Sequence, residues 1–514
     1  MESLREYPLV LTIEFLKNNE PAPAEEPKPI LPSSDEKKLQ TKMLSKLLSN
    51  QILREVDEEN EEDAEAEEDI SEESGDAVSA FSSLPKISSP SSWHPFSKDY
   101  DANIRVIKDI TGNSTCEGTT DDFSKLFANR FDVLRNQLRS QRRELANVLP
   151  ISRMKKSGLK EIQLIGIVND IRTTQNGHRL LELEDESGTV VAIILQGNRE
   201  VFQVAQTIVS DEIIGITGQL SKNGDLFLVN NVIFPDISLH NRQHAAEAPL
   251  YAAFLSDIHV GSKDFMEKQW HSFLRWINGG MGNSRQKDVA GKIKYLVVPG
   301  DIVDGIGIYP NQDKELSIVD LYKQYEALAD YFTLIPEHIS IILQPGNHDA
   351  VRPAEPQPTF DKEIQKLFSA NDVTFVANPS YFSLHGIEIL SYHGSSLLDY
   401  ATNIQQLQYN EPIEIMKVML QKHHIAPMYG GYTPLAPEHK DYMIIDQIPD
   451  IFVTGHVHLA TLGEYRGVTL INASSWQSQT SYQKMLNFIP DPAKLPIADL
   501  QSGKVTMMDF NKQI

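Results

Sequence analysis

The run Leu296-Val-Val-Pro-Gly-Asp-Ile-Val-Asp304 decides the fold, because a short apolar stretch leads directly into a glycine and two carboxylates. Four other polar motifs also follow short apolar runs, at residues 252–255, 339–343, 387–390 and 451–453. Such runs predict buried strands. The carboxyl ends of strands in an α/β fold gather at one edge, so the motifs are expected to converge there. The motifs are Asp257-Ile258-His259, Gly300-Asp301-Ile302-Val303-Asp304, Gly346-Asn347-His348-Asp349, Tyr392-His393-Gly394 and Gly455-His456-Val457-His458.

The motifs contain the residue types that bind a pair of divalent cations. Two cations about 3.5–4 Å apart need nitrogen and oxygen ligands and one bridging carboxylate, and Asp301 is the expected bridge. A water whose pKa both cations lower would attack phosphorus in line with the leaving oxygen, without a covalent enzyme intermediate. The other expected ligands are Asp257, His259 and His458 for one metal and Asn347, His393 and His456 for the second.

Residues next to the expected ligand Asn347 receive other roles. His348 is expected to stabilise the phosphorane and to protonate the leaving 3′ oxygen, with Asp349 fixing the tautomer of its imidazole. Arg352 is either a phosphate contact or one half of a surface salt bridge. The glycines of the motifs allow the backbone to approach a metal or phosphate closely.

The specificity of this prediction comes from the combination of motifs. Any one of them also occurs as a cap or a turn with no chemical role. Five motifs in a fixed order, each behind a predicted strand, favour a functional site. They hold five of the 15 histidines, and we interpret the remaining histidines as ordinary structural residues.

Composition limits the compartment and the partners. The only cysteine, Cys116, excludes an intrachain disulfide and a cysteine-rich zinc site, which fits a reducing cytosolic compartment. No apolar run approaches the roughly 18 residues of a membrane span and no signal-peptide pattern is present, so we expect a cytoplasmic protein without membrane contact. Of the net charge of −24, residues 55–76 supply 14 acidic charges and no basic ones, and subtracting these leaves −10. Contact with DNA would therefore need a local basic patch or a partner.

The chain of 514 residues is too long for one core, and we predict several regions. Few aromatic residues and like-charge repulsion keep residues 55–90 from folding alone. The apolar spacing over residues 37–53 fits a helix that docks a partner or one that is merely local. The expected order is an N-terminal segment with a short helix at 1–54, an acidic and Ser/Pro-rich disordered linker at 55–95, a helical connector at 96–155, an OB-fold domain at 156–240 and a phosphoesterase domain at 248–514.

The connector contains one well-signalled helix. From Asp121 onward apolar residues recur at helical spacing until Pro150 stops the pattern. The opposite face is interpreted either as a solvated face or as one that follows phosphates. It carries Arg130, Arg135, Arg139, Arg142 and Arg143.

Short strands follow the connector, over residues 162–168, 180–183, 190–195, 213–220 and 226–233. Turn signals such as Asn176-Gly177 and Asn223-Gly224 separate them. Five strands in about 75 residues indicate an OB-type barrel, a fold that often binds single-stranded nucleic acid. The barrel has few aromatic residues, so a purely scaffolding role stays open.

The order of the metal-binding motifs resembles the calcineurin-like metallophosphoesterase superfamily, whose fold is an αββα sandwich and whose nuclease branch includes the double-strand-break repair exonuclease. A closer resemblance, from about residue 100 to the C-terminus, is to the small subunits of the archaeal D-family replicative DNA polymerase. It rests on Asp109-Ile-Thr-Gly-Asn-Ser-Thr-Cys116, Gly300-Asp-Ile-Val-Asp-Gly-Ile-Gly-Ile-Tyr-Pro310, Thr433-Pro-Leu-Ala-Pro-Glu-His439 and Trp476-Gln-Ser-Gln-Thr480.

That resemblance implies a 3′ to 5′ exonuclease that proofreads DNA 3′ ends for a large catalytic polymerase subunit. Mn²⁺ would be the preferred metal, with Mg²⁺ or another divalent ion as the alternative. The barrel and the C-terminal surface would bind the partner, other replisome factors are further candidates, and the location would be the cytoplasmic nucleoid. Repair exonucleases often have a histidine where this chain has Asp304, so Asp304 is assigned only a role outside the ligand shell.

Three functions stay open from the sequence. The first is the metal-dependent exonuclease subunit. The second is a scaffold, as in related eukaryotic small subunits that have lost metal ligands, although all seven ligand positions are filled here. The third is a free-standing phosphomonoesterase, which the preceding barrel disfavours.

Overall fold

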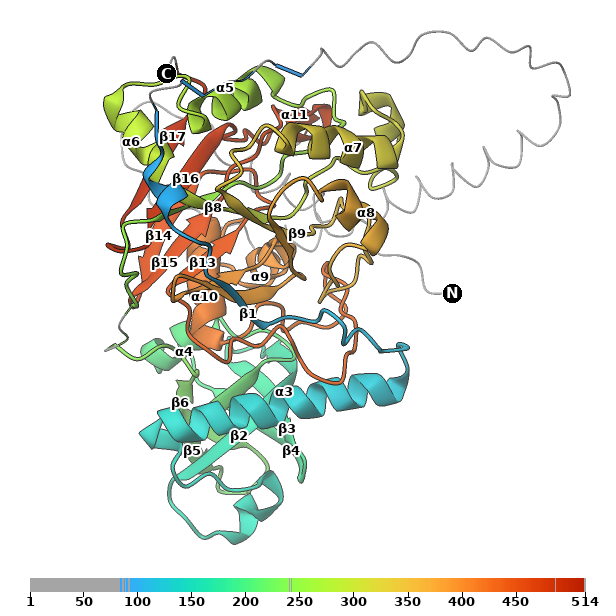
Figure 1. Cartoon of the computed structure of the whole chain (residues 1–514). Helices are drawn as coiled ribbons and strands as arrows, with labels where there is room; N and C mark the ends of the chain where they lie inside the picture. Colours follow the sequence, from blue (N-terminus) through green and yellow to red (C-terminus); the bar gives the residue numbers. More distant parts are fainter. Residues whose placement is uncertain are drawn as a thin grey trace, which may run out of the picture. The chain divides into compact units, whose positions relative to one another are not determined.

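The computed structural model describes residues 84–512 apart from 86, 88, 91, 92, 240, 242 and 486. The predictions for residues 1–54, and for the linker up to residue 83, lie outside the described residues. The described chain forms two six-stranded sheets with helices around them and one closed barrel, as Figure 1 shows. The mixed α/β character and the barrel expected from the sequence are both confirmed.

The first sheet carries three of the strands that precede the polar motifs. They are parallel neighbours, β7 (Tyr251–Phe254), β8 (Ile293–Pro299) and β9 (Ser340–Gln344). The order across the sheet is β10-β9-β8-β7-β16-β17. The outer members are β10 (Val373–Phe375), parallel to β9, and the antiparallel strands β16 (Lys494–Asp499) and β17 (Val505–Asp509).

The second sheet carries the other two motif strands. β12 (Ile387–Ser391) is parallel to β13 (Ile451–Thr454), which is parallel to β15 (Val468–Asn472). The order is β1-β11-β12-β13-β15-β14, and its remaining members are antiparallel. These are β1 (Ile104–Lys108), β11 (Ser380–Leu384) and β14 (Thr461–Tyr465).

The main core lies between the two sheets, because alternate residues of each strand face inward. Phe254 and Val297 of the first sheet share one buried cluster with Ile389 and Val453 of the second. Phe452, one residue before Val453, instead packs with the helices on the outer side of the second sheet. These are α9 (Leu397–Asn403) and α10 (Pro412–Lys422).

Further helices lie beside the first sheet in Figure 1. Phe273 and Trp276 of one of them, α5, pack edge-on against Phe510, just after β17. Helices therefore lie on the outer side of each of the two sheets. The bounds of this group are α5 (Glu267–Ile277), α6 (Ser284–Lys292), α7 (Leu321–Phe332) and α8 (Lys362–Leu367), with the short α11 (Ser481–Met485) near the C-terminus.

The barrel closes in the order β2-β3-β4-β6-β5, with α4 (Arg199–Ala205) between β4 and β5. β2 pairs with both β3 and β5, and a register shift between Val168 and Asp170 bends it between the two partners. That bend explains why β2 is longer than the predicted strand. The strands are β2 (Ile162–Thr173), β3 (Arg179–Asp185), β4 (Gly188–Ile194), β5 (Ile213–Leu220) and β6 (Phe227–Ile233).

The connector holds the predicted helix, α3 (Thr120–Gln141), which begins with a capping box formed by Thr119 and Asp122. From the sequence we expected the arginines of this helix to share one face that is either solvated or follows phosphates. That prediction is wrong for Arg130. This side chain is fully buried, and it pairs with Asp441 at 2.6 Å and donates to the backbone oxygen of Asp211 at 3.0 Å. A charge removed from water needs such partners.

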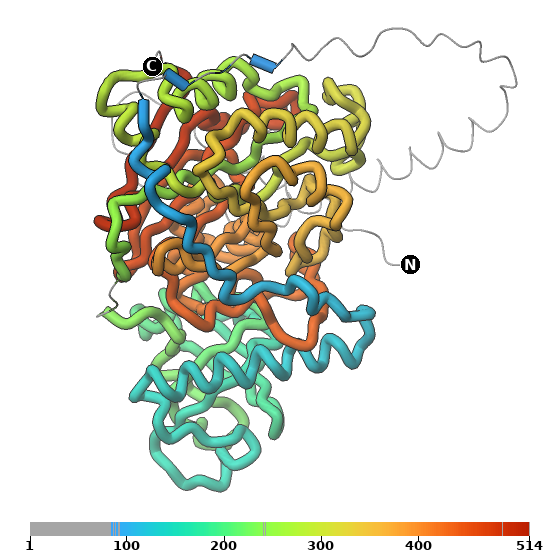
Figure 2. The backbone as a smooth tube through the Cα atoms, viewed as in Figure 1, coloured from blue at the N-terminus to red at the C-terminus, as the bar shows by residue number. Residues whose placement is uncertain are grey.

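The first part of the connector, before α3, runs along the sandwich, as the blue tube in Figure 2 shows. Ser97, in the short 3-10 helix η3 (Phe96–Asp99), donates to the backbone oxygen of Ile293 at 2.8 Å, at the start of β8. β1 then pairs antiparallel with β11 and extends the second sheet. None of the helices among the described residues is long and apolar enough to span a membrane.

Candidate metal centre

The loops after the motif strands bring the expected ligands together. In the first sheet they follow the carboxyl ends of β7, β8 and β9, and in the second those of β12 and β13. Most of the resulting cluster is inaccessible to solvent: Asp257 and His393 are completely buried, and Asp301 is nearly so. The sequence prediction that these five loops converge is therefore matched by the structure.

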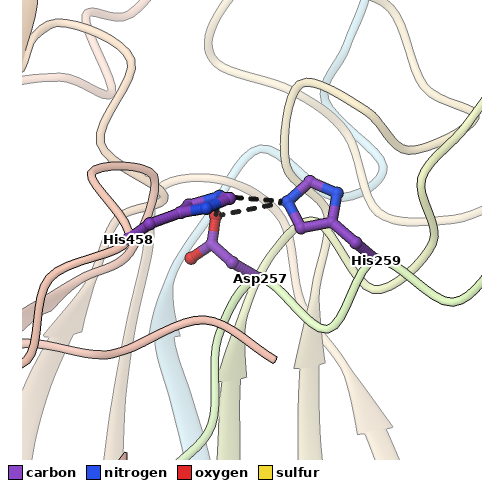
Figure 3. Close-up of side chains that lie close together, drawn as sticks. All are labelled: Asp257, His259 and His458. Carbon is purple, nitrogen blue, oxygen red and sulfur yellow. Dashed lines mark hydrogen bonds and ion pairs between the residues drawn. The ribbon is translucent and has the colours of Figure 1, made fainter. Parts of the chain in front are cut away.

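The first group of ligand atoms comes from Asp257, His259 and His458, which Figure 3 shows facing one another. The Nε2 atoms of His259 and His458 lie 3.1 Å apart, and the Oδ1 of Asp257 lies 3.4 Å from the Nε2 of His458. At most one of two facing imidazole nitrogens can donate a proton to the other. A cation between them would satisfy both lone pairs and the carboxylate.

The second group consists of Asp301, His393 and His456, with Asn347 beside it. The Nε2 of His393 lies 3.3 Å from the Oδ2 of Asp301 and 2.9 Å from the Oδ1 of Asn347. The Nδ1 of His393 donates to the backbone oxygen of Pro299 at 2.9 Å, which fixes the tautomer with Nε2 facing the site.

Asp301 lies between the two groups. Its Oδ2 is 3.3 Å from the Nε2 of His393 and 3.9 Å from the Nε2 of His259. The other oxygen, Oδ1, accepts a hydrogen bond from the backbone N–H of His348 at 2.9 Å, which orients the carboxylate. This is the position that a bridging ligand requires.

The backbone is strained at five of the seven expected ligands. Asp257, His259 and Asp301 have φ values of 52°, 53° and 51°, and His456 and His458 have 67° and 57°. Residues other than glycine rarely adopt this left-handed region, and such strain persists mainly at functional sites. The loops thus hold their side chains in directions that relaxed turns would not give.

Glycines make room for the ligand carboxylates. A Cβ on Gly346 would lie 2.2 Å from the Oδ1 of Asp301, and one on Gly455 would lie 2.5 Å from the Oδ2 of Asp257. Both distances are far below van der Waals contact. Alanine at either position would displace an expected metal ligand.

His348 lies at the edge of the cluster, but its partner differs from the prediction. The Nδ1 of His348 is 2.7 Å from the backbone oxygen of Asp304, whereas the carboxylate of Asp349 accepts from the N–H groups of Gly346 at 2.8 Å and Ile302 at 3.3 Å. The expectation that Asp349 fixes the tautomer of His348 is therefore wrong. Asp349 instead ties the loop after β9 to the loop after β8, because backbone N–H groups from both loops lie within hydrogen-bonding distance of its carboxylate.

Asp304 has the expected place outside the ligand shell. Its Oδ1 lies 3.1 Å from the Nδ1 of His259, whose Nε2 faces the first ligand group. Such carboxylate–histidine pairs orient metal-ligating imidazoles. Asp304, His259 and His348 also form a third close group, in which Asp304 faces the Nδ1 of His259 while the Nε2 faces the first ligand group.

Amide side chains that the sequence reasoning missed hold this outer layer. Gln477 donates to the Oδ1 of Asp304 at 2.9 Å, and Gln312 donates to its Oδ2 at 3.0 Å. Gln483 contacts the Nδ1 of His458 at 3.1 Å. A signal for Gln477 was present, since it also follows a buried parallel strand, β15.

Arg352 forms a salt bridge rather than lying open for phosphate. It contacts Glu438 at 2.8 Å and donates to the hydroxyl of Ser114 at 2.7 Å. Glu438 also accepts from the backbone N–H of Thr115 and Cys116. The sequence analysis offered a surface salt bridge as the alternative, and the structure shows a salt bridge whose carboxylate is buried. Arg352 thereby links two of the segments that carried the family resemblance.

The electrostatics of the cluster favour added positive charge. Burial opposes ionisation of Asp301, yet the imidazoles of His393 and His348 hold the pKa of this carboxyl well below its usual range. Burial also opposes protonation of His393, but Asp301 and Asp257 raise its pKa to about 10. For Asp349, burial and then the charge of Asp301 raise the pKa to about 7. Bound divalent cations would supply the positive charge that, without them, protonated histidines provide to the buried carboxylates.

The donor set therefore fits two divalent cations. In each triad of carboxylate and histidines the ligand atoms lie within 4.8 Å of one another. Asp301 belongs to the second triad, and its Oδ2 lies 3.9 Å from the Nε2 of His259 in the first. Mixed imidazole and carboxylate oxygen ligands suit manganese, zinc or iron, whereas magnesium prefers an all-oxygen shell.

The sequence that builds this fold and site has known relatives. Residues 252–462 match the family model of the DNA polymerase alpha/epsilon B subunits, a class of polymerase subunit. The "DNA polymerase II small subunit" of Archaeoglobus fulgidus is 42% identical, over 77% of this chain and 78% of that protein. The small subunit of Methanocaldococcus jannaschii is 41% identical, over 78% of this chain and 68% of that protein. The small subunit of Methanothermobacter thermautotrophicus is 40% identical, over 81% of this chain and 84% of that protein.

The chain belongs to the family of small subunits of the archaeal D-family DNA polymerase. The names of its relatives refer to this polymerase as DNA polymerase II. A small subunit of this family is part of a DNA polymerase and implies a large catalytic subunit as its partner. Among solved structures, the Stn1–Ten1 complex of S. pombe matches 14% of the chain at 14% identity with a TM-score of 0.14, which is too slight to bear on the fold.

Proposed function

We propose that this subunit is the 3′ to 5′ proofreading exonuclease of its polymerase, and that it hydrolyses DNA phosphodiesters at a calcineurin-like dinuclear metal centre. The observation that carries the proposal is Asp301, a buried member of one triad of ligand atoms whose Oδ2 also lies 3.9 Å from the Nε2 of His259 in the other. A scaffold has no need for buried carboxylates at strained backbone positions, because each costs stability.

Each expected ligand has a defined task. Asp257, His259 and His458 would hold one cation, and Asn347, His393 and His456 would hold the second, with Asp301 shared by both. Mn²⁺ is the proposed element at both positions. When bound, the two cations supply an activated water and positive charge for the phosphoryl oxygens.

The remaining chemistry falls to His348. With Nδ1 on the backbone oxygen of Asp304, the opposite nitrogen faces the cluster, 4.0 Å from the Oδ2 of Asp301. The side chain is 17% exposed, so it lies at the mouth of the site. There it can stabilise the negative phosphoryl group and give a proton to the 3′ oxygen that leaves.

DNA 3′ ends are the proposed substrate because family membership ties the chain to a polymerase. Phosphomonoester hydrolysis is the weaker candidate, since a free-standing phosphatase has no need of a polymerase partner. Association with other replisome factors and with the nucleoid belongs to the same proposal.

The deciding experiment uses a 5′-labelled primer with a mismatched 3′ end and Mn²⁺. The full chain, alone and with its large subunit, should shorten the primer one nucleotide at a time. Asn347→Ala and His348→Ala are the inactive controls. If the wild-type complex cleaves no faster than these variants, the exonuclease proposal is abandoned in favour of a scaffold. Hydrolysis of p-nitrophenyl phosphate without any cleavage of DNA would support the phosphatase.

A further inference from the structure

Two tyrosines stack beside the candidate metal centre. The rings of Tyr309 and Tyr482 are 6.3 Å apart between centroids and inclined by only 24°. Tyr309 belongs to the loop after β8, whereas Tyr482 lies on α11. Both side chains are partly accessible. The pair therefore keeps part of its aromatic surface in contact with solvent.

Both tyrosines are anchored to the metal centre through neighbouring amides. Gln312, in the loop of Tyr309, donates to the backbone oxygen of Asp304 at 2.8 Å and to its Oδ2 at 3.0 Å. Gln483, next to Tyr482, contacts the Nδ1 of His458 at 3.1 Å. Each tyrosine therefore lies on a segment that contacts a residue of the candidate centre through a neighbouring amide.

A hollow of about 390 Å³ opens beside Tyr309. Ile306, Tyr309, Pro310 and Gln312 contribute to its lining. Ile306 is 44% exposed, and Met485 at the end of α11 is 68% exposed. Exposed apolar side chains therefore occur on both segments that carry the tyrosines.

The charges around this hollow suit a nucleobase better than a phosphate. Tyr309 donates from its hydroxyl to Glu315 at 3.3 Å, and Asp313 also lines the hollow. These carboxylates would repel a phosphate. A nucleobase is uncharged, and any of the bases can stack on an aromatic ring whatever the sequence of the DNA.

We propose that Tyr309 and Tyr482 form a stacking site for the unpaired terminal bases of a DNA 3′ end. The inference rests on the proposed exonuclease function and names its substrate as a single-stranded end. Unpaired bases reach such a site at the lowest cost, because a mismatched end has little stacking to lose. The aromatic pair would thereby direct the metal centre to misincorporated nucleotides.

The test measures binding separately from cleavage. A fluorescent single-stranded oligonucleotide is titrated with the full chain in a His348→Ala background, which keeps the DNA intact. Tyr309→Ala and Tyr482→Ala should each raise Kd about 5- to 150-fold, the range expected for loss of one base stack. Tyr309→Phe and Tyr482→Phe should restore binding, because the ring and not the hydroxyl makes the stack.

The matched control is Tyr100→Ala. Tyr100 also belongs to an aromatic pair, with Phe96 at 5.0 Å, but it follows η3, which is attached to the start of β8, the end opposite the metal centre. This variant should bind the oligonucleotide as the parent does. Hydrolysis of bis-p-nitrophenyl phosphate with Mn²⁺, in the wild-type background, should also be unaffected by Tyr100→Ala.

Unchanged Kd in both alanine variants would overturn the inference, whatever the cleavage assay gives. So would weaker association with the large subunit at unchanged DNA affinity, which would make the tyrosines a partner contact. A wild-type chain that cleaves no DNA but binds it through the two tyrosines would refute the exonuclease function alone.

Discussion

The imidazole of His348 rests with its Nδ1 2.7 Å from the backbone oxygen of Asp304, on the neighbouring loop. The adjacent carboxylate, that of Asp349, is occupied by the backbone N–H groups of Gly346 and Ile302. Two neighbouring residues therefore serve the site in different ways. His348 faces the centre, while Asp349 holds together the loops that carry the ligands.

His348→Ala should lower the cleavage rate by about 10²- to 10⁴-fold while the protein still binds two equivalents of Mn²⁺, because it removes a proton donor and no ligand. Asp349→Ala should instead weaken Mn²⁺ binding, since the ligand loops lose their tie. Calorimetric titration with Mn²⁺ beside primer cleavage separates the two effects. Equal loss of metal in both variants would contradict the division of roles.

Asp301→Asn should abolish Mn²⁺-dependent cleavage and leave the fold intact, because it removes a bridging charge without changing the shape of the side chain. In the wild type, Mn²⁺ at 100 times its Kd should stabilise the fold by about 2.7 kcal/mol, measured as a rise in the unfolding temperature. The variant should lose most of that rise. Asp330→Asn, which changes an exposed carboxylate on α7, is the control. Full activity of Asp301→Asn would remove Asp301 from the bridging role.

Arg352→Ala should reduce stability and leave the KM for DNA ends unchanged. The variant leaves the buried carboxylate of Glu438 without its partner, at a cost of about 1–3 kcal/mol or more. Adding Glu438→Gln should recover part of this loss. Thermal unfolding and primer-cleavage kinetics test both points, and a raised KM at unchanged stability would restore Arg352 as a phosphate contact.

Arg130→Met should destabilise the protein by about 3–5 kcal/mol, because Asp441 would remain buried without its counter-ion. Arg139→Met, on the exposed surface of the same helix α3, should have little effect. Chemical denaturation of the two variants measures the difference. Similar small losses in both would mean that α3 is not held by the Arg130–Asp441 pair.

His424 should make stability fall in mild acid. Burial, and then the charge of Arg130, lower the pKa of His424 to about 4, compared with an ordinary value of about 6.5. Between these values the unfolded chain binds a proton that the folded protein excludes. The contribution of His424 is therefore complete above about pH 6.5 and is lost as the pH falls toward 4. Unfolding temperatures between pH 7.5 and 4.5 should fall less steeply in His424→Gln, and parallel curves would contradict this origin.

Much of the fold and the ligand set could be predicted because the signals are local. The apolar run that forms β8 is followed within two residues by Asp301, and β13 is followed as closely by His456. When parallel strands enter one sheet, ligands this near to their ends have little freedom to lie elsewhere. The turn signals of the barrel strands are equally local.

Pairings between distant segments could not be predicted. Arg130 looked like part of a polar helix face, and only the packing of α3 against the loop holding Asp441 buried it. Asp349 looked like the natural partner of His348, but the folded loops brought the backbone of Gly346 and Ile302 to it first.

The residue types and their places behind apolar runs were enough to predict a cluster of candidate metal ligands, because ligand-binding loops in α/β folds gather at the carboxyl ends of strands. The contacts that support those ligands, such as Gln477 on Asp304 and Gln483 on His458, were decided only by the tertiary structure. An amide side chain has no preferred partner until the fold brings one within hydrogen-bonding distance.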